Sequence, residues 1–180
     1  TVYGGQLSHL RAEGKLINLT QRFEASGSAG SCGIGHTRWA THGKPEERNA
    51  HPHLDASGEL AVVQNGIIEN HRILREQLAA SGAVFQSDTD TEVIPHLIAK
   101  ELKGLLAAGS AVDGSTLLKA VQQALPQLDG AYALAVVWAC CPDALVVARR
   151  QAPLLIGFGE GEFLCASDTP ALAGVTRTIL

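Results

Sequence analysis

Apolar residues recur at helical spacing in four segments of the chain. These segments are residues 11–24, 70–80, the stretch that follows 87–92, and about 115–125. A period near 3.6 predicts amphipathic helices, each of which turns one face toward a core. The apolar positions that set the period are Leu16, Leu19 and Phe23 in the first helix, Ile73, Leu74 and Leu78 in the second, and Val93, Leu97, Ile98 and Leu102 in the third.

Short runs of β-branched and apolar residues between turn residues predict strands elsewhere. The runs are residues 33–37, 59–64, 131–138, 144–148, 154–158 and 163–166. The strand over 59–64 is expected to stop at Asn65-Gly66, and Asn70 is expected to cap the helix that follows. Strands toward both ends with helices between them predict an α+β domain, in which helices cover packed antiparallel sheets. With no internal repeat and no linker, residues 1–180 are expected to form one domain.

Composition excludes several classes of partner. Fourteen Lys plus Arg against eighteen Asp plus Glu give a net charge of -4, and no basic block could follow a nucleic-acid backbone. The longest apolar run is well short of the roughly 20 residues of a membrane span, so we expect no membrane segment. The cysteines Cys32, Cys140, Cys141 and Cys165 show no C-x-x-C spacing. A reduced, cytoplasmic setting fits them best.

Three polar clusters stand at strand ends or helix starts, namely residues 36–43, 64–66 and 88–91. Together they could form one site. An Arg grips an α-carboxylate, and a carboxylate holds an α-ammonium. An Asn side chain with a neighbouring Gly N–H stabilises an oxyanion. This set describes a site for an amino acid whose side-chain carbonyl is attacked.

Each cluster also has a structural interpretation, which is the commoner one when the cluster is taken singly. Asn-Gly after a strand is most often a turn, and Asp-Thr-Asp before a helix is most often a cap. Arg38 and Trp39 could be a surface ion-pair donor and a core aromatic residue. A metal site is a further alternative, although no Cys or acidic ligand accompanies its histidines at familiar spacing. Those histidines are His36, His42, His51 and His53.

The sequence as a whole resembles the class II glutamine amidotransferases, in particular the branch that makes glucosamine 6-phosphate. The resemblance covers nearly all 180 residues and rests on strings that occur in a fixed order: HTRWATHGKP, NAHPH, QNGIIENH, SDTDTEVIPHL, GAYALAVV and SDTPAL. It implies an N-terminal-nucleophile hydrolase fold, with two packed antiparallel sheets between helical layers in the order αββα.

The resemblance also implies a reaction and its partners. L-glutamine would be hydrolysed to glutamate and ammonia. A sugar-phosphate isomerase domain of the same polypeptide, absent from this chain, would use the ammonia to convert fructose 6-phosphate to glucosamine 6-phosphate. No cofactor is expected, and the full-length protein would be a homodimer.

Residue roles follow from the same resemblance. Arg38 would bind the glutamine α-carboxylate, Asp90 would bind the α-amino group, and Asn65 with the Gly66 N–H would form the oxyanion hole. Thr41 and His42 would line the pocket, and Trp39 would gate the passage of ammonia.

The family nucleophile is a Cys at the first position of the mature chain, whose own α-amine serves as the base. Cys32 cannot take this role because its nitrogen is in a peptide bond, and we expect it to be a packed strand thiol. Thr1 falls beyond the family's first strand and helix, which we expect this chain to lack. The alternatives are a non-catalytic glutamine-binding module and another class II amidotransferase.

Overall fold

A four-stranded antiparallel sheet lies at the centre of the computed structural model, which describes residues 1–38, 44 and 46–180. Its strands are β3 (His53–Leu54), β4 (Leu60–Gly66), β5 (Tyr132–Trp138) and β6 (Leu145–Arg150), in the spatial order β3-β4-β5-β6. The longest pairing joins β4 to β5 over seven residue pairs, from Leu60 opposite Trp138 to Gly66 opposite Tyr132. β4 and β5 occupy the interior of the sheet, because each has a neighbouring strand on both sides.

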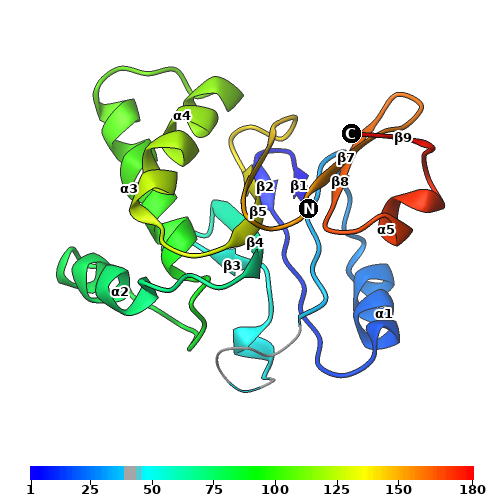
Figure 1. Cartoon of the computed structure of the whole chain (residues 1–180), viewed down its shortest axis with the longest axis horizontal. Helices are drawn as coiled ribbons and strands as arrows, with labels where there is room; N and C mark the ends of the chain where they lie inside the picture. The colour runs from blue at the N-terminus through cyan, green and yellow to red at the C-terminus, as the bar shows by residue number, and fades with distance from the viewer. Residues whose placement is uncertain (39–43, 45) are drawn as a thin grey trace.

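Three helices cover one face of this sheet (Figure 1): α2 (His71–Ala80), α3 (Val93–Ala107) and α4 (Gly114–Ala124). Alternate residues of β4 and β5 point toward them, and these side chains pack with the inner faces of α3 and α4. The buried cluster includes Leu60, Val62, Leu134, Val136, Ile94, Leu97, Ile98 and Leu117. Each such side chain stabilises the fold by roughly 1.5–3 kcal/mol, so the main core lies between this sheet and the helices.

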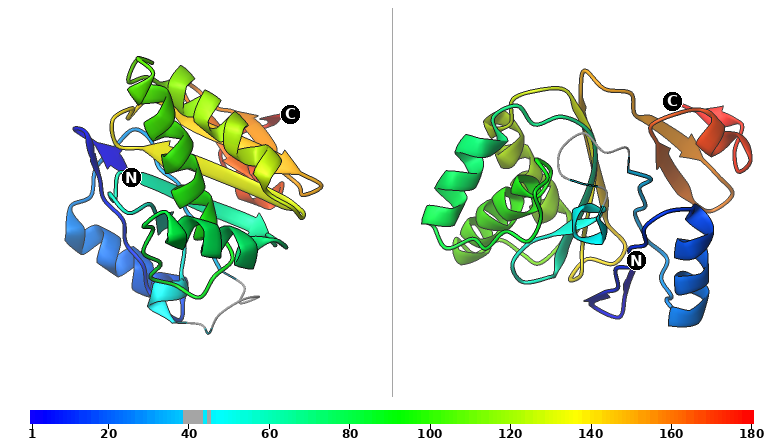
Figure 2. Two further views of the ribbon diagram at one scale, coloured as in Figure 1. Left: turned by 90° about the vertical axis from the view of Figure 1, so that its left-hand side faces the viewer. Right: turned by 90° about the horizontal axis from the view of Figure 1, so that it is seen from below.

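The other face of the central sheet is covered more thinly. A second sheet of β7 (Leu155–Phe158), β8 (Phe163–Ala166) and β9 (Thr178–Ile179) lies there in the order β8-β7-β9. α1 (Leu16–Ser26) and α5 (Pro170–Ala173) lie outside it, as Figure 2 (right) shows. The remaining elements are the hairpin β1 (Val2–Tyr3) and β2 (Gln6–Leu7) and the short 3₁₀ helices η1 (Glu47–Asn49) and η2 (Leu125–Gln127).

The expected α+β arrangement is confirmed, with helices, sheet, sheet and helices in succession. All four predicted helices are present, and the strands from 59–64 onward lie within two residues of their predicted ends. No helix in the described part of the chain is long and apolar enough to cross a membrane.

The predicted strand over 33–37 is wrong. Residues 33–37 form no strand, and within the described residues the nearest β-bridge joins Cys32 to Val2. The segment lines a cavity of about 410 Å³ together with residues of β4 and β5. Ile34 nevertheless packs against the buried Ala61 and Val137 of the central sheet.

The predicted helices differ from the observed ones in the placement of some side chains. Asn70 is the N-cap residue of α2, as predicted, but its side chain makes no capping hydrogen bond and instead bridges the Gln127 carbonyl (2.9 Å) and the Asp129 N–H (3.0 Å). Leu74 and Leu78 are buried, whereas Ile73 is 59% exposed. α1 has the predicted spacing but contains no buried residue, because the chain around it leaves a cavity of about 310 Å³ beneath its apolar face.

β4 does not stop before Asn65-Gly66 but continues through both residues. Gly66 has a φ of 104°, a backbone conformation that L side chains rarely adopt. A Cβ at Gly66 would overlap the carbonyl oxygen of Ala131, which accepts a hydrogen bond from the Ile67 N–H at 3.0 Å. The close approach of β4 to the start of β5 therefore requires glycine at this position.

We predict that Gly66→Ala destabilises the domain far more than Gly82→Ala. Gly82 also has a positive φ, 94°, but a Cβ there would meet nothing within 4 Å. The control should cost only the left-handed backbone strain of about 1–2 kcal/mol, whereas Gly66→Ala adds steric strain of about 1–3 kcal/mol. Urea unfolding measures both changes in the free energy of unfolding. Equal losses would contradict the close approach.

Candidate functional site

Hydrogen bonds link the three polar clusters of the sequence to one another. The first cluster reaches the second through His36, whose Nε2 lies 2.7 Å from Oδ1 of Asn65. It is connected to the third indirectly, because Arg38 and Asn49 both donate to the Lys44 carbonyl and Asn49 accepts a hydrogen bond from the Asp88 N–H at 2.9 Å. The second joins the third where Thr91 Oγ1 donates to Gln64 Oε1 at 2.6 Å. Segments far apart in sequence are thus held at one end of the central sheet.

Asn65 is positioned by the alternation of β4. Val62 and Gln64 point toward the helices, so Val63 and Asn65 point to the opposite face. There Asn65 lines the 410 Å³ cavity between the two sheets, together with Gly35, His36, Thr37, Ser167 and Asp168. Asn65 and Gly66 are both exposed, so both are accessible to a molecule that enters this cavity.

Asp90 lies in the turn before α3 and is only 3% exposed. Its Oδ2 accepts a hydrogen bond from the backbone N–H of Ile68 at 2.8 Å. Ile68 follows β4 by two residues, so this bond fixes the carboxylate beside the strand end that carries Asn65 and Gly66. The predicted carboxylate and the predicted oxyanion donors therefore lie at the same end of β4.

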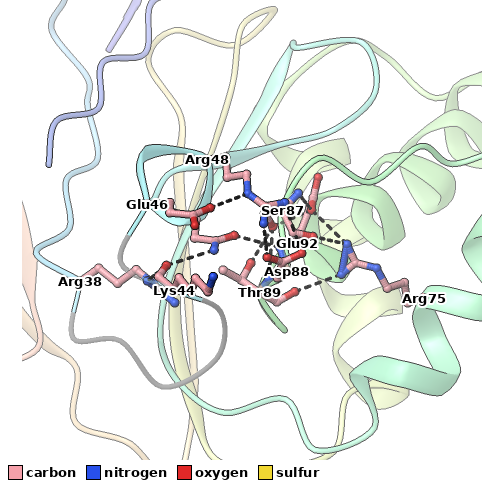
Figure 3. Close-up of polar contacts among 10 residues, drawn as sticks. Arg38, Lys44, Glu46, Arg48, Arg75, Ser87, Asp88, Thr89 and Glu92 are labelled. Carbon is pink, nitrogen blue, oxygen red and sulfur yellow. Dashed lines mark hydrogen bonds and ion pairs between the residues drawn. The ribbon is translucent and has the colours of Figure 1, made fainter.

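Arg38 belongs to a network of polar contacts that extends through Lys44 toward Asp88 (Figure 3). The Arg38 Nη1 donates to the Lys44 carbonyl at 3.1 Å, and the same carbonyl accepts from Asn49 Nδ2 at 3.0 Å. Asn49 is fully buried and, through the Asp88 N–H, connects this loop to the turn that contains Asp90. Arg48 adds an exposed ion pair with Asp88 at 2.5 Å. The segment that carries Arg38 is thus tied to the turn that carries Asp90.

Trp39, Thr41 and His42 lie outside the described residues, so their roles stay predictions.

Glu92 was missed by sequence reasoning, yet it holds the turn before α3 in place. Its carboxylate accepts hydrogen bonds from the Gln86 N–H at 2.7 Å, the Ser87 N–H at 2.8 Å and the Ser87 hydroxyl at 2.6 Å. Arg75 lies 3.5 Å from the same carboxylate and stacks over the Phe85 ring. The only sequence signal for this role was the density of hydroxyl and carboxyl side chains over 87–92, which was interpreted as a helix start.

Three histidines form a ladder behind Asn65. His36 stacks on His51 with ring centroids 4.1 Å apart, and His51 meets His53 edge-on at 4.8 Å. His51 Nδ1 accepts a hydrogen bond from the Gln64 N–H at 3.2 Å, and His53 Nε2 lies 3.0 Å from the Thr89 hydroxyl. Burial, reinforced by nearby positive groups, lowers the pKa of His51 to about 2 and that of His53 to about 3. Both rings are therefore neutral at neutral pH.

The arrangement of His36, His51 and His53 argues against the alternative interpretation in which histidines form a metal site. The stacked rings of His36 and His51 turn their faces toward each other, so their in-plane nitrogens do not converge on one point, and one nitrogen of each of the three rings already has a hydrogen-bond partner. Within the part of the chain that the structure describes, no group of three His, Cys, Asp or Glu side chains could hold a metal ion.

Cys32 is half-buried and packs against Val2, Ala61 and Val137. Burial raises the pKa of its thiol, which makes it a poorer nucleophile at neutral pH. Its expected role as a packed thiol is confirmed, although the segment is not a strand. All four cysteines are free.

We predict that the domain loses stability as the pH falls below about 6.5. His51 and His53 have lower pKa values in the folded protein than their ordinary 6.5, so the unfolded chain binds more protons below that pH. Each should contribute up to about 1.4 kcal/mol per pH unit to the loss. Urea unfolding between about pH 7.5 and 5 measures the slope, and His53→Asn should reduce it. The same slope in both proteins would contradict the assignment.

The chain is similar in sequence to known glutamine amidotransferases. Residues 36–174 match the glutamine amidotransferase domain family. The chain is 59% identical over 180 residues to a glutamine–fructose-6-phosphate aminotransferase (isomerizing) from Nostoc sp. (strain PCC 9229), covering 100% of the chain and 28% of that protein. It is 48% identical to the enzyme of the same name from Brucella suis biovar 1, and that alignment covers 99% of this chain and 28% of the Brucella enzyme. The chain thus spans little more than a quarter of these relatives.

Two solved structures are similar to this chain in fold. The glutamine phosphoribosylpyrophosphate amidotransferase of B. subtilis, complexed with ADP and GMP, superposes with a TM-score of 0.75 at 29% identity, covering 97% of this chain and 36% of that one. A second structure, described as the allosteric regulatory enzyme of purine biosynthesis, superposes with a TM-score of 0.72 at 31% identity. The superposition covers 91% of this chain and 34% of that one.

Proposed function

The chain belongs to the glutamine amidotransferase domain family, and from this premise we propose that it forms the glutamine-hydrolysing site of a longer polypeptide. In this proposal the site converts L-glutamine to glutamate and ammonia. The observation that carries it is the hydrogen-bonded connection of three segments, which brings Arg38, Asn65 with Gly66, and Asp90 to one end of the sheet.

The three groups match the three polar parts of glutamine. The Arg38 guanidinium binds the α-carboxylate, and the buried Asp90 carboxylate binds the α-ammonium. With both ends held, the side-chain amide of glutamine extends toward the exposed end of β4. Asn65 Nδ2 and the Gly66 N–H then donate to the amide oxygen as it becomes an oxyanion. Thr41 and His42 line the pocket in this proposal, as the resemblance implies.

The attacking group in this proposal is the thiolate of a cysteine at the N-terminus of the longer polypeptide, as in the family. Thr1 would then lie downstream of the first strand and helix of the domain. The cysteine's α-amine takes the thiol proton, and the sulfur adds to the amide carbon of glutamine. The tetrahedral intermediate collapses, and the nitrogen leaves as ammonia with that proton. Water then hydrolyses the γ-glutamyl thioester to glutamate and regenerates the thiol.

We further propose that the ammonia is used within the same polypeptide. The relatives are named as isomerising aminotransferases of fructose 6-phosphate, and this chain covers 28% of them. The remainder would contain the isomerase domain that forms glucosamine 6-phosphate, with Trp39 gating the transfer of ammonia. A homodimer and a cytoplasmic setting belong to the same proposal, and the four free cysteines support the latter.

Asn65→Ala in the full-length enzyme should lower kcat for glutamine hydrolysis about 10²- to 10³-fold, the usual effect of removing one oxyanion-hole donor. KM for glutamine should change little, because Arg38 and Asp90 bind the other end of the substrate. Asn18→Ala is the matched control, since Asn18 lies on α1 and its side chain contacts the exposed Glu13 carbonyl. Release of glutamate measures the rate. A rate for Asn65→Ala within about threefold of wild type would refute the oxyanion assignment.

A further inference from the structure

The orientation of the Asn65 side chain decides whether it can serve as an oxyanion donor. An Asn amide presents an acceptor oxygen on one side and a donor NH₂ on the other. Only the arrangement that turns the NH₂ toward the substrate stabilises a negative charge. Asn65 is exposed at the strand end, so packing alone does not choose between the two orientations. A hydrogen-bond partner that accepts only one orientation would make the choice.

His36 is placed to be this partner. Its Nε2 lies 2.7 Å from Asn65 Oδ1, whereas its Nδ1 is buried without a hydrogen-bond partner among the described residues. Burial lowers the pKa of His36, so its ring is neutral and carries a single N–H. A buried N–H without an acceptor is rarer and costlier than an unused acceptor. The proton therefore belongs on Nε2, where it has an acceptor in Asn65.

The ring of His36 is itself held in place. It stacks on His51 with an angle of 16° between the two planes, and His51 is fixed by the hydrogen bond from the Gln64 N–H. Gln64 is the residue immediately before Asn65 in β4. His51, and His36 through it, are therefore attached to β4, the strand that contains Asn65. A shift of β4 would move His36 and Asn65 together.

We propose that His36 is a positioning residue, whose Nε2–H donates to Asn65 Oδ1 and thereby turns the Asn65 NH₂ toward the glutamine amide oxygen. The inference rests on the proposed function. Without His36, the Asn65 amide is free to rotate and presents its oxygen to the developing oxyanion for part of the time. The consequence is a loss of transition-state stabilisation that leaves glutamine binding intact, because Arg38 and Asp90 are unaffected.

A double-mutant cycle in the full-length enzyme tests this role. His36→Ala should lower kcat for glutamine hydrolysis about tenfold, the size of one hydrogen bond, with KM within about twofold of wild type. In the Asn65→Ala background the same substitution should lower kcat less than about twofold, since His36 acts only through Asn65. A full tenfold loss in that background would show that His36 acts independently and would overturn the inference.

A matched pair of amide variants guards against simple misfolding. His36→Gln can place an N–H near the Nε2 position and should restore most of the activity lost in His36→Ala. His36→Asn has an amide too short to reach Asn65 and should remain as impaired as His36→Ala. Equal kcat values for His36→Gln and His36→Asn, with thermal unfolding showing both folded, would overturn the positioning role.

The double-mutant cycle also distinguishes a failure of the positioning role of His36 from a failure of the oxyanion role of Asn65. If Asn65→Ala lowers kcat strongly while His36→Ala keeps a near-normal kcat, only the positioning role of His36 is refuted. A near-normal rate for Asn65→Ala sinks the oxyanion assignment, and the role of His36 with it.

Discussion

The pairing of β4 with β5 is the interaction on which the rest of the structure depends. It contributes seven consecutive residue pairs, and both strands pack on α3 and α4 through the main core. The same pairing carries Asn65 and Gly66 beyond the core, to the point where Gly66 passes the Ala131 carbonyl too closely for any side chain. The exposed strand end is held by its pairing with β5, which continues through Asn65 and Gly66. The proposed oxyanion hole would benefit from a strand end that is fixed in this way, since donors that must reorient during the reaction lose much of their effect.

The polar groups beside this strand end are buried, and their hydrogen bonds offset the cost of that burial. Asn49, His53 and Glu92 are each less than 5% exposed, and each bonds to the turn before α3. These bonds connect a loop, a strand and a turn that are distant in sequence. The turn that carries Asp90 is therefore held by many weak bonds at once, so its position does not depend on any single contact.

Local patterns predicted the elements and the residue types of the site, but not the contacts between them. The 3.6-residue period located α3 because its inner face is uniformly apolar, and the apolar content of β5 identified a buried strand. The segment 33–37 contains the β-branched residues Ile34 and Thr37, yet it forms no strand, because a sequence pattern contains no information on the pairing partner that a strand requires. The bond between His36 and Asn65 joins residues 29 positions apart, so no local period could reveal it.

The central claim is that Arg38, Asp90 and the Asn65-Gly66 end of β4 hold one glutamine molecule among them. A crystal structure of the full-length enzyme soaked with L-glutamate, the reaction product, tests this claim most directly. The account predicts the α-carboxylate on Arg38, the α-ammonium on Asp90 and the γ-carboxyl group within hydrogen-bond distance of Asn65 Nδ2. Glutamate bound elsewhere, or bound here with its α-amino acid end toward Asn65, would contradict it.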